Sequence, residues 1–120
     1  MTASITTPDR PVLLYVTAPS RDAALALGRA LVEERLAACV NVLDGMTSVY
    51  RWNGAIEEAQ EAVLLVKTMA GAYAAAAARV RQLHAYETPC VLEIPLGRGD
   101  ADYVAWLADG IAVPGVKTEG

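Results

Sequence analysis

The sequence contains little positive charge, a single histidine, two cysteines and no phenylalanine. Its 10 Lys and Arg residues stand against 14 Asp and Glu residues, so the net charge is -4 at pH 7. Because such a chain has no basic field to attract a phosphate backbone, we expect no nucleic-acid partner. No apolar run approaches the roughly 18 residues that a membrane span needs, and we therefore expect no membrane partner either.

Cysteine is too scarce for the disulfide framework on which small secreted domains depend. A chain with 54% hydrophobic residues can bury a sizeable core without such a covalent link. Residues 1–8 have neither the cationic start nor the apolar centre of an export signal. We therefore predict that Cys39 and Cys90 are unpaired thiols in a cytoplasmic protein.

Common catalytic signatures are also missing. The sequence has no Gly-x-Ser-x-Gly turn, no phosphate-binding glycine loop and no His-Glu-x-x-His pair. A cysteine nucleophile with His84 as its base is an open alternative, although no feature of the sequence brings the two within reach. We predict that the protein is not an enzyme.

The residues that are present suit a single domain. A length of 120 residues lies within the range of one domain, which typically holds roughly 100 to 150. Residues 1–11 are polar and carry two prolines, and residues 110–120 carry further glycine and proline, so both segments are predicted to be flexible tails. Residues 12–109 are left as one folded unit.

Regular elements are predicted on both sides of a long central hairpin. Residues 12–17 (VLLYVT) form an apolar run of strand length. Ser20 suits the N-cap of a helix that runs to about Arg35, because apolar residues recur at helical spacing behind it. The later elements are a helix over residues 72–84, a strand over 91–96 that Pro95 places at an edge or a strand end, and a short helix capped by Asp100.

The central hairpin is unusually long. A β region over residues 38–52 is interrupted at Asp44-Gly45, and Asn53-Gly54 predicts a two-residue type I′ turn into a return strand over 55–68. At about 3.3 Å per residue, each arm would span on the order of 40 Å. A compact domain of this size needs less, so we expect the tip to dock on another subunit.

The tip itself has the composition of an interface. The two-residue turn predicts that Trp52 lies opposite Ala55, with Arg51 opposite Ile56 and Tyr50 opposite Glu57. Aromatic residues and arginine are enriched at interface hot spots, so we expect the segment Tyr50, Arg51 and Trp52 to contact a neighbouring subunit. The acidic residues Glu57, Glu58 and Glu61 are interpreted as a solvated face that could hold hard divalent ions weakly.

The order strand, helix, strand, strand, helix, strand is typical of an α+β, ferredoxin-like βαββαβ sandwich. In that fold four antiparallel strands carry two helices on one face. The second face of the sheet is left open, which gives a further reason to expect association.

Three segments in this chain resemble those of a known family. They are residues 37–41 (AACVN) after the first helix, 50–54 (YRWNG) at the hairpin tip and 84–89 (HAYETP) after the second helix. In this order and spacing they resemble the divalent-cation-tolerance family CutA, and the resemblance runs from about Val12 to Leu107. It implies ferredoxin-like subunits that assemble as a compact homotrimer, and a function in tolerating or binding copper and similar divalent cations.

The donor residues agree with that implication, and each also has a structural alternative. His84 is an imidazole of the kind copper, zinc and nickel favour, or a histidine that ends a helix. Cys39 is a soft thiolate donor or a small core residue. Glu87 is a hard ligand, a partner that orients the imidazole, or a subunit contact. Tyr86 is expected to form a hydrogen bond at the same contact between subunits.

Two positions depart from the family pattern. Cys90 stands where relatives usually carry an acidic residue, and Val16 stands where some carry a cysteine, so a site with two thiols is in doubt. The alternative function is a trimeric signalling or scaffold module that binds a small molecule or a partner protein in clefts between subunits. Metal titration of the wild-type protein, compared with that of His84→Ala, separates the two hypotheses.

Overall fold

The computed structural model describes residues 9–112. The predicted tails therefore lie mostly outside the described residues. The elements follow one another as β1 (Pro11–Ala18), α1 (Arg21–Glu33), β2 (Cys39–Trp52), β3 (Ala55–Met69), the short 3-10 helix η1 (Ala70–Ala72), α2 (Tyr73–Leu83), β4 (Val91–Pro95) and α3 (Ala101–Asp109).

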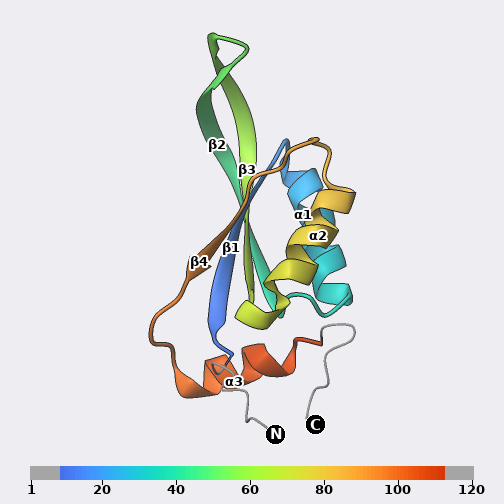
Figure 1. The fold of residues 1–120 in the computed structure, drawn as a ribbon, viewed down its shortest axis with the longest axis vertical. Coiled ribbons are helices and arrows are strands. Elements are labelled where there is room, and N and C mark those ends of the chain that lie inside the picture. Colours follow the sequence, from blue (N-terminus) through green and yellow to red (C-terminus); the bar gives the residue numbers. More distant parts are fainter. Residues whose placement is uncertain (1–8, 113–120) are drawn as a thin grey trace, which may run out of the picture.

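The four strands form one antiparallel sheet in the order β2-β3-β1-β4. Helices α1 and α2 cover one face of this sheet, and α3 lies across the end opposite the hairpin tip (Figure 1). The α+β, ferredoxin-like fold predicted from the sequence is confirmed. Strand β4 is an edge strand that ends at Pro95, which is where a residue without an N–H is tolerated.

The core lies between the sheet and its two covering helices. Burial alternates along β1, so that Val12, Leu14 and Val16 are fully buried while their neighbours are half-buried. Leu31 of α1 and Val80 of α2 pack into the same cluster. Each such side chain contributes about 2 kcal/mol through burial, which fixes the helices on this face.

Helix α1 begins where the sequence predicts and ends earlier. The Ser20 hydroxyl accepts a hydrogen bond from the Ala23 N–H at 3.1 Å. The helix stops at Glu33 because Arg35 adopts a left-handed conformation, with φ of 60°. The Leu36 N–H then donates to the Leu31 carbonyl and the Arg35 N–H to the Val32 carbonyl, which is a Schellman ending.

The hairpin of β2 and β3 has the predicted register. Trp52 lies opposite Ala55, Arg51 opposite Ile56 and Tyr50 opposite Glu57. Asn53 and Gly54 both have positive φ, 49° and 80°, as a type I′ turn requires. The register shifts between Leu43 and Met46, so the interruption at Asp44-Gly45 is a β-bulge.

Beyond the bulge the hairpin projects from the body as an arm, which makes the molecule 55 × 29 × 26 Å (Figure 1). We call the part between Met46 and Glu61 the hairpin arm. None of the helices in residues 9–112 is both long and apolar enough to cross a membrane.

Helix α2 is one residue shorter at each end than the helix predicted over residues 72–84, because Ala72 belongs to the 3-10 helix η1 and His84 caps the C-terminus. His84 is the C-cap residue of α2 and has extended backbone angles, φ of -74° and ψ of 145°. Its side chain therefore belongs to the loop between α2 and β4 rather than to the helix.

Candidate functional site

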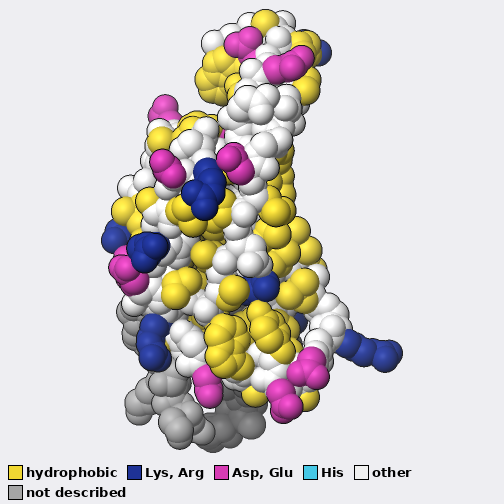
Figure 2. All heavy atoms as spheres, turned by 180° about the vertical axis from the view of Figure 1, so that it is seen from behind, with side chains coloured by type: hydrophobic (Ala, Val, Ile, Leu, Met, Phe, Trp, Pro, Cys, Tyr) yellow, Lys and Arg dark blue, Asp and Glu magenta, His cyan; other side chains and the backbone are white. Residues whose placement is uncertain are grey.

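The hairpin tip is apolar on both of its faces. Tyr50 and Trp52 lie on one face and are 44% and 64% exposed. Val49 and Ile56 lie on the other face and are 64% and 59% exposed. Figure 2 shows hydrophobic side chains gathered at the tip and again over the body below it. Sequence analysis singled out Tyr50 and Trp52 but missed Val49 and Ile56, although apolar residues on both strand faces beside the turn were the available signal.

Apolar side chains are also exposed on the sheet face that the helices leave open. Leu43 of β2 and Leu92 and Ile94 of β4 are exposed there. They share this face with Tyr15 of β1, whose hydroxyl contacts the Met46 sulfur at 3.5 Å. Exposed apolar area of this extent is typical of a surface that another protein chain covers.

A carboxylate lies where the arm meets the body. Glu61 of β3 accepts a hydrogen bond from the Ser48 hydroxyl at 2.6 Å and another from the Tyr86 hydroxyl at 2.8 Å. The sequence predicted that Glu61 belongs to a solvated acidic face. That prediction is wrong for Glu61, because the carboxylate is half-buried and uses both of its oxygens inside the chain.

His84 has both ring nitrogens engaged. Nε2 lies 2.7 Å from the Thr17 carbonyl oxygen, and Nδ1 accepts from the Tyr86 backbone N–H at 3.0 Å. Because a carbonyl can only accept, Nε2 carries the proton and the imidazole is the neutral Nε2–H tautomer. The His84 ring also packs on the Tyr86 ring, with centroids 4.8 Å apart.

Two side chains near Glu61, the Tyr86 hydroxyl and the Cys90 thiol, have raised pKa values. Burial, the hydrogen bond to Glu61 and the charge of Glu61 raise the pKa of the Tyr86 hydroxyl to about 12. Burial and, second, the same negative charge raise the pKa of the Cys90 thiol. Cys90 is therefore poorly suited to act as a thiolate. Both cysteines are unpaired in the structure, as predicted.

Two of the predicted metal donors, Cys39 and His84, do not meet within one chain. Cys39 lies opposite Lys67 of β3, whereas His84 bonds to Thr17, which lies opposite Val63. Four strand residues separate these levels, which is about 13 Å along the sheet. Glu87 is exposed in the loop after α2. Within residues 9–112, no group of three or more His, Cys, Asp and Glu side chains is arranged to hold a metal ion.

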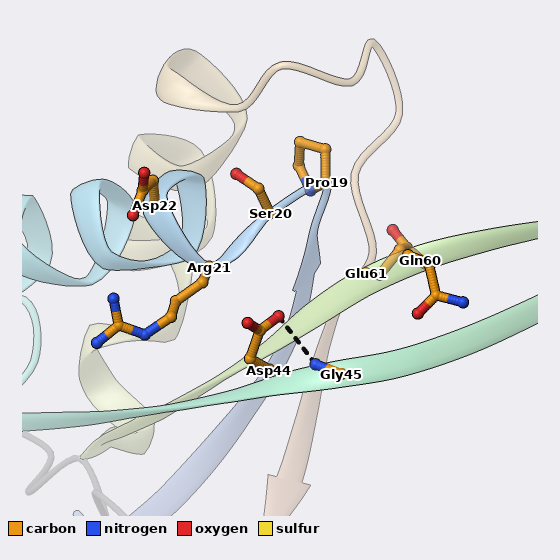
Figure 3. A pocket seen from close by; sticks show the side chains of 8 residues that line it. All are labelled: Pro19, Ser20, Arg21, Asp22, Asp44, Gly45, Gln60 and Glu61. Atoms are coloured by element: carbon orange, nitrogen blue, oxygen red, sulfur yellow. Dashed lines mark hydrogen bonds between the residues drawn. The ribbon is translucent and has the colours of Figure 1, made fainter.

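A pocket of about 350 Å³ lies beside the arm (Figure 3). The N-terminus of α1 contributes Arg21 and Asp22, and the bulge contributes Asp44, whose carboxylate accepts from the Gly45 N–H at 2.8 Å. Glu61 completes the wall on the β3 side. Charges of both signs therefore face one hollow, which the sequence did not predict because its walls come from three separate segments.

The fold and this arrangement define a class: a ferredoxin-like α+β subunit with a projecting hairpin whose apolar surfaces are suited to association. Residues 12–110 match the family model described as CutA1 divalent ion tolerance protein, and the chain belongs to this family. The family predicted from three short segments is confirmed.

The comparisons agree at the level of sequence and of structure. The divalent-cation tolerance protein CutA of Thermus thermophilus is 44% identical over 97 residues, which cover 81% of this chain and 94% of that protein. The CutA homolog of Xenopus laevis is 41% identical over 95 residues, covering 79% of this chain but only 63% of that longer protein. A solved structure of the T. thermophilus protein matches with a TM-score of 0.83 over 85% of this chain and 99% of that one.

Proposed function

We propose that this protein is a homotrimer that acts in tolerance of divalent cations and binds copper or chemically similar ions without catalysing a reaction. The observation that supports it most directly is the CutA family match over residues 12–110. The relatives' printed names refer to divalent-cation tolerance, and we extend that role to this chain.

Assembly is supported by the exposed apolar surfaces. Trp52 at the tip of the arm and Leu92 on the open sheet face of the body are both more than half exposed. A second copy of the chain that accepts the arm would bury both kinds of surface. Arg51 at the tip and the half-exposed ring of Tyr86 at the hairpin root extend the proposed interface.

The proposed cation ligands are His84 together with Cys39 or Glu87 of neighbouring subunits. Imidazole, thiol and carboxylate groups have the donor chemistry that copper-class ions prefer. The geometry of a single chain does not assemble them, so the site depends on assembly. His84 could offer Nδ1 by giving up the Tyr86 N–H, and losing such a hydrogen bond costs about 1 kcal/mol.

Calorimetric titration with Cu(II) tests this ligand set. Because a protonated imidazole cannot bind a metal, the affinity of the wild type should fall between about pH 7.5 and about pH 5.5. His84→Ala should lose most of the affinity at the higher pH. Gln82→Ala is the matched control, because it changes an exposed side chain near the end of the same helix and leaves the imidazole in place. Equal affinity in wild type and His84→Ala would exclude His84 as a ligand.

A second candidate function is a trimeric signalling or scaffold module that binds a small molecule or a partner protein in a cleft between subunits. The pocket beside the arm favours it, because Arg21 and Asp44 offer opposite charges to one ligand. A thermal-shift screen with small zwitterionic compounds tests this function. The expected stabilising compound should lose its effect in Arg21→Gln.

The proposed compartment is the cytoplasm, on the strength of the unpaired thiols. Relatives are not uniform in this respect. A relative from Arabidopsis thaliana is named as chloroplastic, and a solved relative from Archaeoglobus fulgidus is described as periplasmic. Fractionation of cells that express the tagged full chain would place it.

A further inference from the structure

The hairpin arm is poorly supported where it leaves the body. Strand β1 pairs with β3 only as far as Ala62, so within residues 9–112 the two strands of the arm pair only with each other. Gly45 in the bulge has φ of 80° and open space around it. A two-stranded ribbon joined at such a point can pivot, and contacts at its root must set its direction.

Glu61 supplies the strongest of these root contacts. The Ser48 hydroxyl donates to one carboxylate oxygen from across the hairpin, and the Tyr86 hydroxyl donates to the other from the α2–β4 loop. Hydrogen bonds to an ionised carboxylate are roughly twice as strong as neutral ones. The alternative root contact, from the Tyr15 hydroxyl to the Met46 sulfur, uses a weak acceptor.

The loop that carries Tyr86 is itself anchored to the sheet. The Tyr86 N–H donates to His84 Nδ1, and His84 Nε2–H donates to the carbonyl of Thr17 near the end of β1. The bonds therefore run in series from β1 through His84, Tyr86 and Glu61 to Ser48. They connect three strands of the sheet through one short loop.

We infer that residues 84–86 are a latch that fixes the direction of the hairpin arm relative to the sheet. Through Glu61 the latch determines where the tip aromatics Tyr50 and Trp52 are presented. His84 therefore helps to position the arm, although it lies at a distance from it. A histidine that merely ends a helix would not have this role. This inference does not depend on the proposed cation function.

Hydrogen exchange of the intact protein, followed by mass spectrometry, tests the latch. Tyr86→Phe removes one hydroxyl and keeps the ring. Amides in residues 46–49 and 58–61 should then exchange about tenfold faster or more, as expected when a hydrogen bond to a charged group is lost. The matched control is Tyr103→Phe, since that hydroxyl accepts a hydrogen bond from the Lys67 ammonium group at the other end of the sheet. Unchanged exchange in the arm of Tyr86→Phe would overturn the inference.

A second variant tests the series arrangement. His84→Ala should accelerate exchange in the same arm residues, although His84 makes no hydrogen bond to the arm. The double variant His84→Ala/Tyr86→Phe should exchange about as fast as the faster single variant, because both changes open one chain of bonds. An arm unaffected by His84→Ala, or additive effects of the two changes, would show that the loop and the arm are independent.

Discussion

The chemistry of single residues here is decided by partners that are distant in the sequence. Glu61 and Tyr86 are 25 positions apart, and His84 and Thr17 are 67 positions apart. No local sequence pattern predicts either of these hydrogen-bonded pairs. Sequence analysis therefore found His84 and Tyr86 as unusual residues but could not predict that the imidazole is engaged at both nitrogens, or that Glu61 is the acceptor.

The Tyr86 hydroxyl gives a pH prediction at this scale. Its pKa is raised from 10.0 to about 12 in the folded chain, so the protonated phenol stabilises the fold below about pH 10. That contribution is lost as the pH rises from about 10 to about 12. Urea denaturation at fixed protein concentration should show the wild type losing more stability over this interval than Tyr86→Phe does. Parallel losses in the two proteins would contradict the assignment.

The ends and turns of the elements follow local chemistry wherever that chemistry is strong. Ser20, Asp100 and the Asn53-Gly54 turn were predicted correctly, since each acts through its own neighbouring backbone groups. The end of α1 was predicted two residues late, because Arg35 takes a left-handed conformation that the sequence does not mark with glycine. The start of α2 was predicted one residue early, and the 3-10 helix before it was not predicted, because no capping side chain marks the boundary between the two.

The end of α1 gives a prediction at the scale of elements. Arg35 is exposed and has φ of 60°, a conformation that costs a residue with a Cβ about 1 kcal/mol. Arg35→Gly should therefore raise the free energy of unfolding by about 0.5–1 kcal/mol in chemical denaturation. Arg29→Gly is the matched control, because the same change inside the helix should lower it by about 1 kcal/mol. A destabilised Arg35→Gly protein would contradict the account of this helix end.

The molecule as a whole is elongated by one arm with apolar residues on both faces of its tip. The fold could be predicted because its strand and helix order follows from local patterns and from the resemblance of three segments. Two of the predicted metal residues, Cys39 and His84, were not brought together, because they lie at different levels of the sheet. Any site that unites them must be made between subunits, and assembly is therefore the central claim.

Size-exclusion chromatography with light scattering tests that claim most directly. The wild type should have the mass of a trimer, which is three times 12.7 kDa. Trp52→Ala should weaken the trimer by about 2 kcal/mol or more, and Glu58→Ala, a change of an exposed charge on the same arm, should have little effect. A wild type that elutes as a monomer of 12.7 kDa would contradict the account.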